Sequence, residues 1–260
     1  QGRETSQLFK DYKTEKEEID QYLYFLEEKE IIFYVDSRKE YNFFPLLSLE
    51  WDFPSFITNA IIDIVDIKKV TGVLLEQLEA LGCVSVSFRF YLRLSLTQLS
   101  SLLERLSLSS ITAIDITLPF SKSFSTEVIT SLCKRNPRLN RIFFFNSPIQ
   151  KVIDSDIDKC IIFFIVQNIN CLNCGVVHWD YFTTNTPHYT ESQKHNTCLN
   201  RKIAIDSSGN IKNCPSMAKS YGNIKDTKLI DVVNNPEFQK LWYIHKDQIS
   251  VCKDCEFRHI

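Results

Sequence analysis

The sequence predicts an α/β fold whose core is a partial (β/α) barrel. Runs rich in β-branched and aromatic residues, typical of strands, recur roughly every 20 to 30 residues through the middle of the chain. Patterns with helical spacing occupy the intervals between these runs. Repeated strand–helix units need a mainly parallel sheet with right-handed crossovers, which leads to this fold class.

The individual elements follow from the periodicity of apolar residues. We expect buried or half-buried strands at residues 59–65, 84–90, 111–118, 141–145 and 160–166. We expect helices between them at residues 70–81, 96–106 and 125–134, the first of which ends at Gly82.

A helix and a strand are expected before this core. Thr14 and Glu17 have the spacing of a capping box, and apolar residues follow on one helical face; a strand is then predicted at residues 30–35. A small winged-helix unit would show this order and would offer a strand edge to a guest peptide. The alternative is a helix packed on the main domain. Residues 37–54, rich in charge, aromatic residues and proline, are expected to form a linker or covering segment.

Three parts are therefore predicted in the chain. Residues 1–47 form the helix–strand unit, a candidate for peptide recognition, together with its linker. Residues 48–169 form the partial barrel, and residues 170–260 form a cysteine-rich domain.

Composition excludes several classes of partner. The chain is 44% hydrophobic, enough for a full core, and its formal net charge is −2 with the signs well mixed. It has no basic patch for nucleic acid, no apolar run long enough to span a membrane, and no secretion signal, so we expect a cytoplasmic protein. No glycine-rich phosphate loop occurs.

Cysteine carries the strongest chemical signal. Six of the nine cysteines follow residue 170, which favours a local metal site over a disulfide framework. The other three, Cys83, Cys133 and Cys160, lie in apolar patterns and are expected to be inert core residues.

The six C-terminal cysteines have spacings suited to a soft metal or a cluster. Cys171 and Cys174 form one C-x2-C pair, and Cys252 and Cys255 form another. Between these pairs, residues 202–214 predict a β-hairpin that would bring Cys198 and Cys214 close to one site. His188 and His195 are either further ligands or ordinary surface histidines.

These features resemble a known domain. Cys198, a hairpin with Gly209, Cys214-Pro215, the run Tyr221-Gly-Asn-Ile224, an aromatic segment from Phe238 to Trp242, and Cys252-x2-Cys255 follow in that order. The order resembles the SPASM domain that follows the barrel of radical S-adenosylmethionine enzymes acting on ribosomally made peptides. The runs HYTESQKHNTCLNRKIAIDSSGNIKNCPSM and VCKDCEFRHI are most similar to the SPASM-domain peptide maturases of grasp-with-spasm systems. Those proteins are encoded beside an ATP-grasp ligase and a short precursor peptide.

The resemblance is specific over residues 188–260 and softer over the core, and two departures qualify it. Radical enzymes of this kind need C-x3-C-x2-C after the first strand, because three thiolates leave one iron open for the cofactor. Here Asp66-Ile-Lys-Lys follows that strand and the motif occurs nowhere, so we expect no cleavage of S-adenosylmethionine. The family pattern also continues as C-x2-C-x5-C-x3-C, whereas this sequence stops where the third cysteine would come, so we expect at least one site to be incomplete.

The resemblance implies ligands and a function. Cys198 and Cys214 would begin one auxiliary cluster, and Cys252 and Cys255 a second, holding [4Fe–4S] or zinc. Cys171 and Cys174 lie outside the SPASM pattern and would either complete a four-thiolate site with Cys198 and Cys214 or form a separate zinc knuckle. Four thiolates close the coordination sphere, which suits a structural or electron-transfer role.

The implied task is maturation of a ribosomally synthesised peptide, in which the protein binds the precursor peptide and works with an ATP-grasp ligase. We favour an adaptor over an enzyme and predict no catalytic residue. Two alternatives stay open: a redox enzyme that modifies the peptide with its auxiliary clusters, and a metal-stapled structural module without chemistry of its own.

Overall fold

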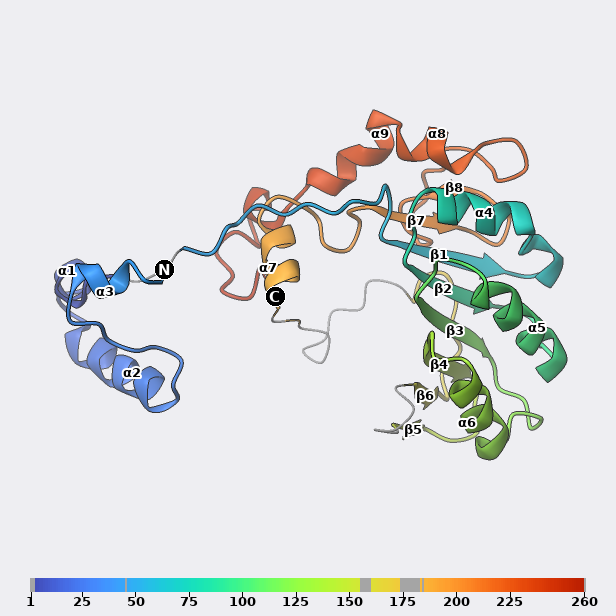
Figure 1. Ribbon diagram of the computed structural model, residues 1–260, viewed down its shortest axis with the longest axis horizontal. Helices are drawn as coiled ribbons and strands as arrows, with labels where there is room; N and C mark the ends of the chain where they lie inside the picture. The colour runs from blue at the N-terminus through green and yellow to red at the C-terminus, as the bar shows by residue number, and fades with distance from the viewer. Residues whose placement is uncertain (1–2, 45, 155–159, 174–182, 184, 260) are drawn as a thin grey trace. The chain divides into compact units, whose positions relative to one another are not determined.

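The computed structural model describes residues 3–44, 46–154, 160–173, 183 and 185–259, and Figure 1 labels its helices and strands. The chain divides into two compact units, Gln1–Leu49 and Glu50–Ile260, each described here by itself. The boundaries predicted from sequence, after residues 47 and 169, stay predictions.

The first unit is helical. It contains α1 (Thr5–Asp11), α2 (Lys16–Glu28) and α3 (Arg38–Tyr41). The helix expected after Thr14 is confirmed as α2, but the capping box is wrong, because Glu15 is the N-cap and makes no side-chain capping bond. The strand expected at residues 30–35 is also wrong. Glu30 turns the chain at φ 56°, and no strand in the described ranges pairs with the residues that follow, so an extended segment there gains no ladder of hydrogen bonds. The winged-helix interpretation is not confirmed.

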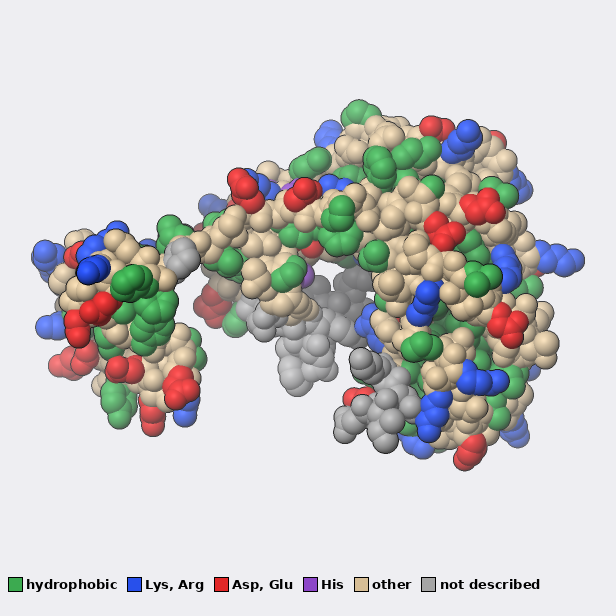
Figure 2. All heavy atoms as spheres, in the orientation of Figure 1, with side chains coloured by type: hydrophobic (Ala, Val, Ile, Leu, Met, Phe, Trp, Pro, Cys, Tyr) green, Lys and Arg blue, Asp and Glu red, His purple; other side chains and the backbone are tan. Residues whose placement is uncertain are grey.

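This unit has little core of its own. No residue of α1, α2 or α3 is buried, and residues such as Leu8, Ile19, Leu23 and Leu26 are only half-buried. Large apolar side chains lie exposed, many of them aromatic: Tyr12, Tyr22, Tyr24, Phe25, Phe33, Tyr34, Phe43 and Phe44. Among the described residues of this unit, thirteen large apolar side chains are exposed, and Figure 2 shows hydrophobic side chains gathered on its surface. Exposed apolar surface of this kind marks interaction sites.

The second unit is built on one open eight-stranded sheet in the order β5-β6-β4-β3-β2-β1-β7-β8. Neighbouring strands run parallel except at the two edges, where β5 and β8 are antiparallel to their partners. The α/β class and the parallel pairing are confirmed, whereas closure into a barrel is not. The strands are β1 (Asn59–Ile64), β2 (Ser85–Phe90), β3 (Ala113–Pro119), β4 (Leu139–Phe145), β5 (Lys151–Ile153), β6 (Ile161–Phe164), β7 (Lys202–Ile205) and β8 (Ile211–Lys212).

Three crossover helices cover one face of this sheet (Figure 1). They are α4 (Gly72–Ala80), α5 (Leu96–Ser107) and α6 (Thr126–Arg135), as the sequence predicts. Each begins at a hydroxyl N-cap that accepts a backbone N–H of the first turn, and the cap of α5 is a full capping box. Their buried leucines pack on the residues that alternate toward them along the strands, including Ile62, Phe88, Ile116 and Phe144.

The opposite face of the sheet carries charge. Asp63 of β1 lies beside Arg89 of β2 in the register, and the two side chains form a bidentate pair at 2.6 and 2.9 Å. Both are almost completely buried, with side-chain exposures of 2% and 7%. Asp115 and Arg141 form a second pair on β3 and β4, where the arginine is half exposed.

The cysteine-rich part of the chain shares this sheet, which the sequence did not reveal. β7 pairs in parallel with β1, from Asn59 opposite Lys202 to Ile62 opposite Ile205. β7 and β8 form the predicted hairpin and extend the sheet beyond β1. Short helices complete the unit: α7 (Thr186–Ser192), α8 (Leu229–Val233), α9 (Pro236–Gln239) and the 3-10 turns η1 (Ile67–Lys69), η3 (Lys240–Tyr243) and η4 (Lys246–Gln248). Within the part of the chain that is described, no helix has the length and apolar character needed to cross a membrane.

The two ion pairs allow a matched test. Asp63→Asn removes the charge that balances a buried guanidinium, so we expect it to lower the free energy of unfolding by about 3 to 5 kcal/mol. Asp115→Asn makes the same chemical change beside a solvated arginine and should cost less than about 1 kcal/mol. Urea unfolding of both variants measures the difference. Equal losses would show that burial of the Asp63–Arg89 pair has no energetic consequence.

Candidate metal centre

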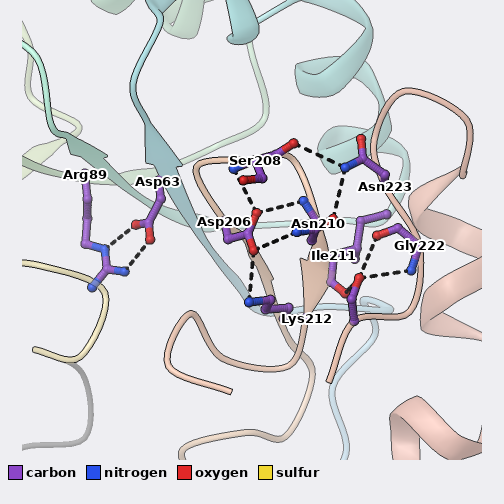
Figure 3. Close-up of polar contacts among 10 residues, drawn as sticks. Asp63, Arg89, Asp206, Ser208, Asn210, Ile211, Lys212, Gly222 and Asn223 are labelled. Atoms are coloured by element: carbon purple, nitrogen blue, oxygen red, sulfur yellow. Dashed lines mark hydrogen bonds and ion pairs between the residues drawn. The ribbon is translucent and has the colours of Figure 1, made fainter. Parts of the chain in front are cut away.

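The β7–β8 hairpin is fixed by its turn. Asp206 Oδ1 accepts the backbone N–H groups of Ser208 and Asn210, each at 2.9 Å, and Oδ2 lies 2.9 Å from Lys212 Nζ (Figure 3). Gly209 adopts φ +91°, which few other residues tolerate. Burial raises the pKa of Asp206, but the hydrogen bonds from Lys212 and Asn210 outweigh it and hold that pKa below its ordinary value.

The Tyr221-Gly-Asn-Ile224 run closes against this hairpin. Asn223 Nδ2 donates to Ser208 O at 3.2 Å and to Asn210 Oδ1 at 3.1 Å (Figure 3). Ile211 N also donates to Gly222 O at 2.9 Å. Gly222 has φ +138°, and a Cβ there would lie 2.5 Å from Thr227 Oγ1. The chain after Cys214 is therefore held along β8.

Cys198 lies in a turn just before β7. Asn196 Oδ1 accepts the N–H groups of Cys198 and Leu199, each at 3.1 Å, and Asn196 N donates to Trp242 O at 2.8 Å. The Cys198 thiol is free and exposed, and Lys202 Nζ lies 3.7 Å from its Sγ atom. The positively charged ammonium group of Lys202 therefore lies beside this thiol.

Cys214 lies at the other end of the hairpin. β8 ends at Lys212, opposite Ala204, and Cys214 follows it by two residues. The side chain of Cys214 is buried, with Sγ 3.2 Å from Ser216 Oγ. Cys198 and Cys214 flank the hairpin, and their convergence on one site stays a prediction.

Cys252 and Cys255 lie in successive tight turns after η4. Cys252 N donates to Ile249 O at 2.9 Å, and Cys255 N donates to Cys252 O at 3.0 Å. Arg258 stabilises the second turn by donating to Cys255 O and to Asp247 Oδ1, at 3.2 and 2.6 Å. Both thiols are free, Cys252 half-buried and Cys255 exposed.

Cys171 lies near Tyr91, away from the hairpin cysteines. Burial raises the pKa of Tyr91, and Cys171 is near enough to contribute to that increase. Tyr91 directly follows β2, at the carboxyl edge of the sheet, whereas Lys202 pairs with the first residue of β1, at the amino edge. A six-residue strand separates these edges by about 20 Å.

The grouping of the cysteines is left open by this arrangement. Across the described ranges, no three His, Cys, Asp or Glu side chains converge closely enough to hold a metal ion. The four-thiolate grouping of Cys171 and Cys174 with Cys198 and Cys214, and the separate zinc knuckle, stay predictions, because Cys174 lies outside the described residues.

Comparison with known families identifies the domain that contains the hairpin and its cysteines. Residues 197–256 match the SPASM iron–sulfur cluster-binding domain. Cys198, Cys214, Cys252 and Cys255 all lie within this SPASM domain, which begins just before β7 and ends just after the last C-x2-C pair. No curated protein and no solved structure matches the chain.

The donor set of the SPASM domain suits such a cluster. Iron–sulfur clusters are held by cysteine thiolates, and the domain offers two hairpin cysteines and a C-x2-C pair. Lys202 adds a positive charge beside Cys198, where a cluster held by thiolates would carry negative charge. These residues would hold the cluster, and a bound cluster would supply electron transfer or a structural staple.

The sequence did not reveal a cluster of aromatic rings around His195, three residues before Cys198. The ring of His195 packs on Trp51 and Tyr243, at centroid distances of 5.2 and 5.5 Å, and the Arg201 guanidinium lies 5.7 Å from Trp51. Trp51 is far from His195 in sequence, so no local pattern links them. Burial lowers the pKa of His195, and the charges of Arg201, His245 and Lys194 lower it further. His188, the other histidine considered, is half-exposed in α7 and its pKa is also lowered, by burial and by Lys246.

Serine substitutions test the ligand assignment. We expect Cys214→Ser to lower the iron bound per chain roughly by half, since it removes a ligand from one of two predicted clusters. Cys83→Ser is the matched control, because Cys83 is equally buried but its thiol donates to Ser85 O in the core. Iron, zinc and sulfide would be assayed in each purified protein. Equal iron in all three proteins would remove Cys214 from the ligand set.

His195 gives a pH test. Its pKa in the folded protein lies below the ordinary 6.5, so below about pH 6.5 the unfolded state binds more protons and the free energy of unfolding falls. His195→Phe keeps the ring contacts and should make this decline shallower between pH 7.5 and 5.5. Tyr243→Phe, which changes the neighbouring ring, should leave the slope unchanged. Parallel curves for wild type and His195→Phe would refute the assignment.

Proposed function

We propose that this protein takes part in the maturation of a ribosomally synthesised peptide, binding the precursor and acting with an ATP-grasp ligase. The observation that carries the proposal is the SPASM match over residues 197–256 together with the thiol donors that the hairpin and the last turns present. Its further support is the sequence resemblance to SPASM-domain maturases.

In this proposal the SPASM domain holds an iron–sulfur cluster as a staple or electron carrier. Zinc is the alternative occupant of the same thiolates. We place the protein in the cytoplasm, where thiols stay reduced.

We assign recognition of the precursor to the first unit. Its exposed aromatic residues include the stacked pair Tyr22 and Phe25 on α2, with centroids 6.4 Å apart. Residues 1–49 contain 11 acidic and 7 basic residues, so this unit carries a net charge of −4. A basic, amphipathic segment complements such a surface by burying its apolar side and pairing its charges.

The face of the sheet opposite α4, α5 and α6 is the second surface that suits an extended peptide. Its accessible groups include the Asp115–Arg141 pair and the stacked rings of Phe143 and Phe163, 4.6 Å apart, whereas the Asp63–Arg89 pair is almost completely buried. Half-buried polar and aromatic groups of this kind give orientation and contact area without a catalytic pair. This favours the adaptor role.

Titration calorimetry with the precursor peptide and the ligase tests the proposal. We expect the double variant Tyr22→Ser/Phe25→Ser to weaken binding of the precursor at least about tenfold, or 1.4 kcal/mol. Leu108→Ser is the control, because Leu108 is 91% exposed but belongs to the second unit, and its effect should stay within about twofold. If the wild-type protein binds neither the precursor nor the ligase, the proposed function fails.

The redox-enzyme alternative has its own signature. Such an enzyme would alter the mass of the precursor when a reductant is supplied, whereas an adaptor would leave the precursor unchanged until the ligase and ATP are added. Mass spectrometry of the peptide after each incubation separates the two roles.

A further inference from the structure

A second pair of cysteines lies far from the SPASM domain, in the opposite half of the sheet. Cys133 is on the last turns of α6, and Cys160 directly precedes β6. The thiol of Cys133 donates to Cys160 Sγ, and the two sulfur atoms are 2.9 Å apart. Both side chains are 2% exposed and belong to the main hydrophobic core.

This separation is unusual for two thiols. It exceeds the covalent S–S bond length of about 2.05 Å by only about 0.9 Å, so a small adjustment of the two side chains would bring the atoms into bonding distance. Cys83 shows the ordinary arrangement of a core thiol in the same domain: it is completely buried and donates to the Ser85 carbonyl oxygen at 3.2 Å.

We propose that Cys133 and Cys160 form an intrachain disulfide that ties α6 to β6 when the protein meets a peroxide. One cysteine, as the thiolate, attacks a peroxide oxygen and becomes a sulfenic acid while the other oxygen leaves as hydroxide. The second thiol then attacks the sulfenic sulfur and water leaves. In total, two thiols and one hydrogen peroxide give one disulfide and two waters, with two electrons passing from sulfur to oxygen.

The position of this pair gives the bond a structural effect. The two cysteines are 27 residues apart in sequence, and the bond would close a loop containing the interior strand β4 and the edge strand β5. Closing a loop restricts the unfolded chain and so stabilises the folded one. Sheet edges open more easily than sheet centres, so the bond would act where local opening is easiest.

Burial sets the kinetics of the reaction. Because both sulfurs are 2% exposed, peroxide reaches them only when the end of α6 opens locally. Oxidation of this pair is therefore slower than oxidation of an exposed thiol such as Cys198, and the bond, once formed, is equally shielded from reductants.

The test is a two-step thiol-labelling experiment on the purified protein. Exposed thiols are blocked with N-ethylmaleimide under native conditions, hydrogen peroxide is added, and the protein is then denatured in acid and labelled with iodoacetamide. Digestion without reductant should yield a peptide pair joined through Cys133 and Cys160, with Cys83 recovered as a labelled thiol. Separate labelling of Cys133 and Cys160, or their oxidation to sulfinic acids without a crosslink, overturns the proposal.

Thermal unfolding of the oxidised and reduced proteins tests the disulfide independently. The oxidised wild-type protein should unfold at a higher temperature than the reduced protein, and the double variant Cys133→Ala/Cys160→Ala should show no such shift after the same treatment. Cys83→Ala, which removes the isolated core thiol, should retain the shift. A shift that persists in the double variant would show that the stabilising oxidation lies elsewhere and would refute the assignment.

Discussion

The pairing of β7 with β1 is the interaction on which the arrangement of this protein depends. It joins the first residue after the Cys198 turn to the first strand of the core, with four residues in register. Two further contacts secure the same junction: Lys69 Nζ donates to Ser207 O at 2.6 Å, and Leu229 N donates to Gln77 Oε1 at 2.8 Å. Because backbone ladders fix both distance and direction, the hairpin cysteines are held at the amino edge of the parallel sheet.

This placement separates the two chemical regions of the second unit. Thiols gather at the amino edge of β1, whereas the buried Asp63–Arg89 pair lies toward the carboxyl ends of β1 and β2. Carboxyl ends of parallel strands are where α/β proteins usually bind their ligands. A cluster held at the amino edge would therefore lie at a distance from any ligand bound at the carboxyl ends, in keeping with a staple or an electron carrier.

Much of the fold could be predicted because local signals and packing agree. Hydroxyl caps at Thr71, Ser95 and Ser125 mark helix starts, and continuous apolar runs mark strands buried in a parallel sheet. The hairpin could be predicted because Asp206 and Gly209 are residue types that favour tight turns. The strand expected at residues 30–35 failed because a strand needs a partner, which composition alone does not reveal.

The candidate site was predictable in its residue types and less so in its geometry. The spacings around Cys198, Cys214, Cys252 and Cys255 suffice to identify a SPASM domain. They do not reveal the join with β1, nor the packing of Trp51 on His195, since both bring together residues separated by well over a hundred positions. Cys133 and Cys160 were expected to be inert for the same reason: each fits its own apolar pattern, and only the packing of α6 on β6 brings the sulfurs together.

The SPASM match and its thiol donors lead us to expect an iron–sulfur cluster in this domain. The most direct test of this expectation is the absorption and electron paramagnetic resonance spectrum of anaerobically purified protein, before and after reduction with dithionite. A bound cluster should give a broad charge-transfer absorption from thiolate and sulfide to iron, which bleaches on reduction as a paramagnetic signal appears. A colourless protein that contains only zinc and gives no signal after reduction would contradict this expectation.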